Sequence, residues 1–260
     1  MNKKDKRLNN LLALLQESPD LSVHSLAEML NVSDMTIRRD LNYLKENQLF
    51  LRNHGIALKP VGSNNIKNIE NEYSLSSERT KYLSEKQRIG SFAASMIEAN
   101  DTIILDSGTT IAEMSRHIPE HLNLNITCYN YCILTQLFQK EGIRITLAGG
   151  TLHKDDQMFE SSYGNDLIKS QRACKFFMAA SGVHEALGLT CAHNYEVLTK
   201  RAAMQSSLTS ILLVDSSKFG QIRTAYVAQL NEIDTIVTDS GISPEWAETI
   251  RSMGITLHIV

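Results

Sequence analysis

The chain has 260 residues and a net charge of −3, with 42% hydrophobic and 21% charged residues; this composition excludes a wholly disordered protein and predicts one large or two ordinary domains. No apolar run approaches the about 18 residues of a membrane span, and no apolar stretch typical of a signal peptide follows the charged N-terminus, so we expect a cytoplasmic protein with no membrane partner. Four scattered cysteines and lone histidines predict neither a disulfide framework nor a metal site, and we expect no cofactor.

Three short helices are expected near the N-terminus. Apolar residues recur at helical spacing over Leu8–Leu15 and over Val23–Leu30, where Ser22 can cap the second helix. Ser33 is typical of an N-cap residue, and a third helix is expected from Met35 to about Glu46. Two short strands at 48–51 and 56–58 complete the pattern. Helices followed by a small hairpin predict a winged helix-turn-helix domain over residues 1–58.

The third helix has the face that DNA recognition requires. Ile37, Leu41 and Leu44 are spaced to face the core, and Arg39 falls nearly opposite them. Arg can donate twice to guanine and Asn can pair with adenine, so an outward face with these residues suits the major groove. The alternative is an ordinary solvated helix face, which the complete helix-turn-helix pattern disfavours. Met35, Asn42 and Glu46 lie near Arg39 on the outward face, and Arg38 lies on its flank.

A change of pattern predicts a second domain. Residues 59–84 are rich in Asn, Ser and Glu and are interpreted as a linker. From residue 85, helical segments alternate with short apolar runs, which predicts an α/β domain with a mainly parallel sheet over residues 85–260. The expected strands are Thr102–Leu105, Leu124–Thr127, Ile143–Leu147, Lys175–Ala179, Ile211–Val214, Thr235–Val237 and Ile255–Ile259.

Polar loops follow several of these strands. Ser107-Gly108-Thr109-Thr110 after the first strand can present backbone N–H groups and hydroxyls to an anion at a helix N-terminus, although a well-capped helix start has the same pattern. Lys218 follows a later strand and is either a cation for an anionic ligand or a surface lysine. Glu196 and Lys200 form either a surface ion pair or a pair that binds sugar hydroxyls. Small-residue turns lie at Gly149-Gly150 and Gly182.

Both halves resemble DeoR-type bacterial transcriptional regulators. The N-terminal match is the run Val32–Leu41 together with Arg52-x-His54-Gly55. The C-terminal match comprises Glu85-Lys86, Leu105–Thr110, Gly149-Gly150, Gly182, Glu196-x-x-x-Lys200 and Asp215–Gly220. The resemblance implies a recognition helix with Thr36, Arg38 and Arg39 and a wing with Arg52 and His54. With the helix pattern, the predicted DNA-contacting residues are Ser33, Met35, Thr36, Arg38, Arg39, Asn42, Arg52 and His54.

The same resemblance implies a sensor domain similar to the ribose-5-phosphate isomerase fold, with a phosphorylated sugar as effector. Cys128-Tyr129 is similar to a pair in the member for which the family is named, so a pentose or deoxypentose phosphate is expected. Ser107 to Thr110 are implied to hold the phosphate, with Lys218 close to the ligand. The predicted effector-binding residues are Asp106, Ser107, Gly108, Thr109, Thr110, Tyr129, Gly149, Gly150, Gly182, Glu196, Lys200 and Lys218.

Two functions remain to be distinguished. The first is a homo-oligomeric repressor, a dimer or larger, that binds double-stranded operator DNA and responds to the sugar phosphate. The alternative is an isomerase-like enzyme with an accessory DNA-binding domain, for which Asp106, Glu196 or Asp215 would be the general base. The glycine-rich, lysine-containing loop expected of the isomerase is not found, and fold similarity does not imply activity. We therefore expect a regulator and not an enzyme.

Overall fold

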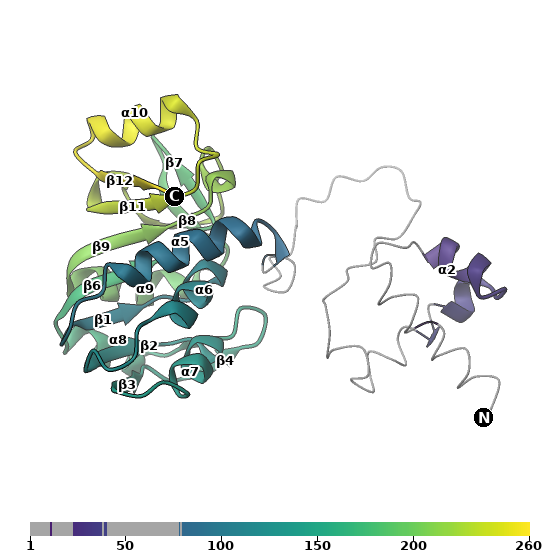
Figure 1. Cartoon of the computed structure of the whole chain (residues 1–260), viewed down its shortest axis with the longest axis horizontal. Helices are drawn as coiled ribbons and strands as arrows, with labels where there is room; N and C mark the ends of the chain where they lie inside the picture. Colours follow the sequence, from purple (N-terminus) through teal and green to yellow (C-terminus); the bar gives the residue numbers. More distant parts are fainter. Residues whose placement is uncertain (1–10, 12–22, 38, 41–77, 79) are drawn as a thin grey trace. The chain divides into compact units, whose positions relative to one another are not determined.

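The computed structural model describes Leu11 and residues 23–37, 39–40, 78 and 80–260 (Figure 1). The chain divides into two compact units, Met1–Glu72 and Tyr73–Val260, called here the N-terminal unit and the C-terminal unit. The predicted domain boundaries after residues 58 and 84 stay predictions. None of the described helices has the length and apolar composition needed to span a bilayer.

The described part of the N-terminal unit is helical. Helix α2 (Val23–Met29) lies within the predicted second helix and buries Leu26 and Ala27, two of its predicted apolar positions. A further helix contains residues 34–37 and 39–40, where the third helix is predicted. The predicted first helix, apart from the helical and buried Leu11, and the predicted strands at 48–58 lie outside the described residues.

The C-terminal unit is built on a seven-stranded parallel sheet of order β12-β11-β9-β6-β1-β2-β3. Each of the seven apolar runs predicted from the sequence is one of its strands, with small differences at the ends. Strands covered on both faces are apolar on both sides, which is why they stand out as continuous runs in the sequence. The strands are β1 (Thr102–Leu105), β2 (Leu124–Cys128), β3 (Ile143–Leu147), β6 (Ala173–Met178), β9 (Ser207–Leu213), β11 (Thr235–Thr238) and β12 (Thr256–Ile259).

Helices cover both faces of this sheet (Figure 1). Successive strand residues point to opposite faces, so Ile104 and Phe176 belong to one buried cluster and Ile103 and Phe177 to the other. The first cluster is completed by α8 (Ser162–Lys169), α9 (Tyr195–Gln205) and α10 (Pro244–Ser252). The second is completed by α5 (Leu83–Ser95), α6 (Thr109–His117) and α7 (Tyr131–Leu137). This three-layer arrangement confirms the predicted α/β class.

The C-terminal unit also contains shorter elements, which the sequence pattern did not indicate. Strands of three or four residues are too short to show a period, so composition alone does not separate them from loops. Two of them form an antiparallel hairpin, three form an antiparallel sheet of order β10-β8-β7, and two are single 3₁₀ turns. They are β4 (Thr151–His153), β5 (Met158–Glu160), β7 (Gly182–His184), β8 (Gly188–Cys191), β10 (Ala225–Ala228), η1 (Ser216–Lys218) and η2 (Leu230–Glu232).

Candidate functional site

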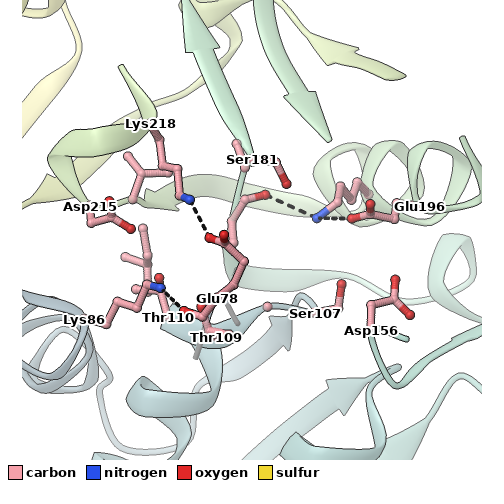
Figure 2. A pocket seen from close by; sticks show the side chains of 16 residues that line it. Glu78, Lys86, Ser107, Thr109, Thr110, Asp156, Ser181, Glu196, Asp215 and Lys218 are labelled. Carbon is pink, nitrogen blue, oxygen red and sulfur yellow. Dashed lines mark hydrogen bonds and ion pairs between the residues drawn. The ribbon is translucent and has the colours of Figure 1, made fainter. Parts of the chain in front are cut away.

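A pocket lies at the carboxyl ends of β1, β6 and β9, which are neighbours in the sheet. From β1 the chain adds β2 and β3 on one side and then returns to place β6 and β9 on the other side. The loops after β1 and β6 therefore diverge, and such a switch point is where open parallel sheets bind ligands. Figure 2 shows the side chains that line this pocket.

One wall of the pocket is the N-terminus of α6, formed by Ser107, Gly108, Thr109 and Thr110. Gly108 has a φ of 130°, a conformation that favours glycine, and a Cβ there would lie 3.2 Å from the Cβ of Ala179. No side chain among the described residues caps this helix. Its first backbone N–H groups and the positive end of the helix dipole therefore favour an anion at this wall.

Three lysines line the pocket, Lys86, Lys200 and Lys218, and Figure 2 labels the first and the last of them. Lys218 follows β9, and its Nζ donates to Glu78 Oε2 at 2.8 Å. Lys86 lies in the first turn of α5 and is 1% exposed. Its Nζ donates to the backbone carbonyls of Glu78 and Lys81 at 2.6 and 2.9 Å. Burial, partly offset by attraction to Asp215, lowers the pKa of Lys86.

Beneath the pocket, the fully buried carboxylate of Asp106 joins four elements. Its Oδ1 accepts from the Tyr129 hydroxyl at 2.6 Å and from the amide of Ser107 at 2.8 Å. Its Oδ2 accepts from Lys200 Nζ at 2.5 Å and from the amide of Ala179 at 2.9 Å. These bonds connect the loop after β1 to the loops after β2 and β6 and to α9, so they hold the floor of the pocket in one arrangement.

Carboxylates of Asp156, Glu196 and Asp215 also line the pocket. Glu196 accepts from the amide of His193 at 3.0 Å and lies 3.5 Å from Lys200 Nζ, and burial raises its pKa despite the attraction of Lys200. Asp215 Oδ2 is buried and has no hydrogen-bond partner in the part of the chain that the structure describes. Such oxygens are acceptors suited to the hydroxyl groups of a ligand. No group of three or more described His, Cys, Asp or Glu side chains is placed to hold a metal ion.

Most of the predicted effector-binding residues come together at the pocket. Asp106 and Tyr129 do not line it and instead lie beneath it, bonded to each other. Gly149, Gly150 and Gly182 do not line it either. The residues that do are Ser107, Gly108, Thr109, Thr110, Glu196, Lys200 and Lys218.

The position of Gly149 and Gly150 follows from strand order. They come after β3, the outermost strand, which is separated from β1 by β2. A Cβ at Gly150 would lie 2.3 Å from the carbonyl oxygen of Glu160, so this glycine allows the chain to pack closely against β5. Gly182 begins β7, and the residue before it, Ser181, is the one that lines the pocket. Ligand contacts by these three glycines stay predictions that the pocket geometry does not favour.

Five residues with chemistry at the pocket were missing from the predicted effector-binding set, although Lys86 and Asp215 belong to the runs that carry the family resemblance, and Lys86 also had a signal in the helix pattern. Lys86, Ile89, Gly90 and Ala93 are spaced i, i+3, i+4 and i+7, and all four are buried on one face of α5. A lysine on the apolar face of a helix indicates a polar or charged partner in the interior. The other four, which lie in loops or in the segment read as linker, had no such pattern. The five are Glu78, Lys86, Asp156, Ser181 and Asp215.

In the N-terminal unit, the described part of the predicted recognition helix has the expected faces. The amide of Thr36 donates to Ser33 Oγ at 3.3 Å, which confirms that Ser33 caps the helix. Ile37 is fully buried, whereas Met35 is 67% exposed and Arg39 is also exposed. The DNA contacts themselves stay predictions. The remaining predicted DNA-contacting residues lie outside the described ones: Arg38, Asn42, Arg52 and His54.

Comparison with known proteins places both halves of the chain. Residues 7–60 match the model of the DeoR-like helix-turn-helix domain, and residues 81–240 match that of the DeoR C terminal sensor domain. The chain is 29% identical over 255 residues to the deoxyribose operon repressor of Escherichia coli (strain K12), covering 98% of each chain. It is 32% identical over 238 residues to the glycerol-3-phosphate regulon repressor of the same strain, covering 92% of each chain.

Among solved structures, ribose 5-phosphate isomerase A from Methanocaldococcus jannaschii is similar over 52% of this chain and 53% of its own, with 14% identity and a TM-score of 0.38. That likeness is too slight to carry an argument about function. The two domain matches and the full-length relatives confirm the predicted resemblance and support the repressor interpretation over the isomerase alternative. The chain belongs to the DeoR family of transcriptional repressors, with a helix-turn-helix domain followed by a sensor domain.

Proposed function

We propose that this chain is a cytoplasmic homo-oligomeric repressor whose N-terminal unit binds operator DNA and whose C-terminal unit binds a phosphorylated sugar that controls DNA binding. The supporting observation is the division of the pocket into two chemical parts. The α6 N-terminus and Lys218 favour a phosphate, and Asp156 and Glu196 supply acceptors for sugar hydroxyls. A free sugar would leave the cationic part unused, and a free phosphate would leave the acceptors unused.

A pentose or deoxypentose phosphate is the proposed effector class. One full-length relative is a deoxyribose operon repressor and another is a glycerol-3-phosphate regulon repressor, so both names point to small metabolites that carry hydroxyl or phosphate groups. The effector acts on DNA binding only if it has different affinities for the DNA-competent and DNA-incompetent arrangements of the oligomer. We propose that it favours the incompetent arrangement.

The hydrogen bonds of the buried Asp106 carboxylate also agree better with ligand binding than with catalysis by this residue. Both oxygens of Asp106 already accept hydrogen bonds, one of them from the ammonium group of Lys200. A general base must reach a substrate proton with an available oxygen, so Asp106, which does not line the pocket, is not suited to that role. Glu196 and Asp215 do line the pocket. The full-length relatives are repressors, and on that ground we propose that the chain binds its sugar phosphate without converting it.

A thermal-shift titration of the full chain tests the effector class. Deoxyribose 5-phosphate, ribose 5-phosphate and the two free sugars are compared at equal ionic strength. A ligand present at 100 times its dissociation constant adds about 2.7 kcal/mol of stability, which raises the melting temperature clearly. We expect a shift with at least one sugar phosphate and none with its free sugar. Equal shifts with the phosphorylated and free forms would contradict a phosphate-binding wall at α6.

Arg39→Ala tests the DNA-binding half. If Arg39 reads a base edge, the variant is expected to lose about 1–3 kcal/mol of operator affinity and to tolerate more bases at one position of the site. The measurement is a gel shift on DNA selected by the full chain from a random pool. Arg223→Ala, an exposed arginine of the C-terminal unit, carries the same charge change and serves as the matched control. An unchanged midpoint for Arg39→Ala would remove this residue from the base-reading set.

A further inference from the structure

The anion site of the pocket holds a carboxylate of the chain itself. Glu78 Oε2 accepts from Lys218 Nζ at 2.8 Å, and Glu78 Oε1 accepts from Lys81 Nζ at 2.9 Å. Burial alone would raise the pKa of Glu78, but the hydrogen bonds from the two lysines outweigh it and lower the pKa to about 2. Figure 2 shows Glu78 between Lys218 and Lys86, in the pocket that Thr109 and Thr110 also line. Glu78 is thus an ionised group placed where the proposed phosphate would bind.

The backbone beside Glu78 is held by the pocket as well. The ammonium group of Lys86 has three N–H donors, and two of them donate to the carbonyl oxygens of Glu78 and Lys81. Two of the pocket lysines therefore bind the short stretch from Glu78 to Lys81, called here the Glu78 segment: Lys218 binds a side chain and Lys86 binds the main chain. These are the same cations that an anionic ligand of this pocket would use.

The space left in the pocket is too small for a sugar phosphate. With Glu78 in place, about 30 Å³ is open to a water-sized sphere, and one water molecule needs about 10–15 Å³ of such volume. Binding of a larger ligand requires that part of the lining moves. The loops after β1 and β6 are fixed through Asp106, whereas the Glu78 carboxylate is held by Lys218 and its carbonyl by Lys86, two cations that can bind a phosphate instead.

We propose that Glu78 is an internal competitor for the effector: the phosphate takes the place of the Glu78 carboxylate beside Lys218 and releases the segment that leads to the N-terminal unit. This inference rests on the proposed phosphate-binding function. Glu78 lies six residues after Glu72, the last residue of the N-terminal unit. Occupation of the pocket therefore changes the connection through which the DNA-binding unit is attached.

The competition has a thermodynamic consequence. If the pocket accepts the phosphate only when Glu78 is displaced, the apparent affinity is the intrinsic affinity reduced by the fraction of molecules with Glu78 displaced. By linkage, any change that stabilises the contact of Glu78 with Lys218 lowers the affinity for the ligand. Ligand binding destabilises that contact by the same free energy. A purely structural Glu78–Lys218 pair would have the opposite effect, because its removal would disorder the lysine that the phosphate needs.

The test uses the full chain and inorganic phosphate, which probes the anion site whatever the sugar is. Phosphate is titrated at constant ionic strength, and the melting temperature gives the half-saturating concentration. Glu78→Gln keeps the size of the side chain and removes its charge, and Glu185→Gln is the matched control with an exposed carboxylate outside the pocket. We expect half-saturation of Glu78→Gln at a concentration lower by about tenfold or more than in the wild type and the control.

The outcomes separate the two proposals. A saturable phosphate response with equal half-saturation in all three proteins would overturn the internal competitor and leave the proposed function standing. Weaker binding by Glu78→Gln would also overturn it, since it would make Glu78 a supporting residue. The absence of a saturable response in every protein would overturn the proposed anion site, and the competitor with it.

A second measurement uses only the wild-type chain, so it tests the proposal even if Glu78→Gln fails to fold. Lys81 has 57% of its side chain exposed and belongs to the Glu78 segment. Trypsin cleavage after Lys81 in the wild-type chain is expected to become faster as phosphate is added. The reason is that the Glu78 segment, once released, fits the active site of the protease more easily. Cleavage that is slowed or unchanged by phosphate would overturn the proposal.

Discussion

Asp106→Ala is expected to lower the free energy of unfolding of the C-terminal unit by about 3–5 kcal/mol, because it removes the nearer carboxylate partner of the buried Lys200 ammonium group and leaves only the longer pair with Glu196 at 3.5 Å. The side chains of Asp106 and Lys200 are 0% and 2% exposed, so water does not replace the missing partner. The substitution also removes the acceptor for the Tyr129 hydroxyl and for the amides of Ser107 and Ala179. The Tyr129 hydroxyl and the Ser107 amide would then be buried without these bonds, and the partly buried amide of Ala179 would lose its acceptor.

Urea unfolding followed by the fluorescence of Trp246 measures this effect. Trp246 is the only tryptophan of the chain, and it packs against Phe219 with ring centroids 5.3 Å apart, so its signal reports on the C-terminal unit. The control is Asp106→Asn combined with Lys200→Met, which removes both charges and keeps an acceptor oxygen. We expect the double variant to be more stable than Asp106→Ala. A loss below about 1 kcal/mol for Asp106→Ala would show that the pair does not hold the pocket floor.

The contribution of the Asp106–Lys200 pair to stability depends on pH in a direction that can be predicted. Burial would lower the pKa of Lys200, but attraction to Asp106 and then to Glu196 outweighs it and raises the pKa above the ordinary value. A raised pKa in the folded state adds stability that is fully present below the unfolded pKa of about 10.4 and is lost as the pH rises through the folded pKa. Urea unfolding of the wild type at several pH values should therefore show that the stability contributed by Lys200 is constant at neutral pH and is lost only in strongly alkaline solution.

Thr109→Glu is expected to weaken sugar phosphate binding by at least about a hundredfold. Thr109 is the first residue of α6, is 9% exposed and lines the pocket, so a carboxylate there would lie at the wall proposed to hold the phosphate. Two unit charges about 4 Å apart repel by about 4 kcal/mol at an effective dielectric of 20. The glutamate would also compete for the same helix N–H groups. Calorimetric titration of the full chain with the effector found in the thermal-shift screen gives the dissociation constant.

Thr109→Gln separates charge from size in this experiment. Glutamine has nearly the same volume as glutamate and no charge, so it tests how much of the loss comes from crowding. We expect Thr109→Gln to bind at least tenfold more tightly than Thr109→Glu, and both variants to bind DNA as the wild type does, because the substitution lies in the C-terminal unit. Equal losses in the two variants would place the phosphate away from the α6 N-terminus.

The frame of the C-terminal unit could be predicted because its signals are local. A strand such as Thr102–Leu105 is covered on both faces, so every residue in it is apolar or β-branched and the run is visible without any knowledge of its neighbours. The polar loop that follows is visible for the same reason, since Ser107 to Thr110 interrupt two apolar segments. The predicted anion wall and its helix therefore coincide with the observed pocket lining.

The other features of the pocket depend on which residues come together in space, and the order of residues along the chain does not show this. Gly149-Gly150 looked equivalent to the loop after β1, but the sheet order places β3 at the edge and the pocket between other strands. Asp106 was predicted to touch the ligand, and only the arrangement of β2, β6 and α9 shows that its oxygens are already bonded. Glu78 lies 140 residues before Lys218, in a segment with no periodicity, so nothing in the sequence joins the two.

The four-way junction at Asp106 bears on how such a pocket can change its specificity. Because one buried carboxylate fixes the loop after β1, the amide of Ala179 and the side chain of Lys200, the backbone frame does not depend on the identity of the residues on the rim. Ser181 lines the pocket and takes no part in the junction, whereas the buried Asp156 carboxylate accepts from the amide of Met158 and from the Tyr195 hydroxyl. A substitution of Ser181 therefore leaves these bonds in place, which makes this position the natural starting point for redirecting the sensor to another metabolite in a biosensor library.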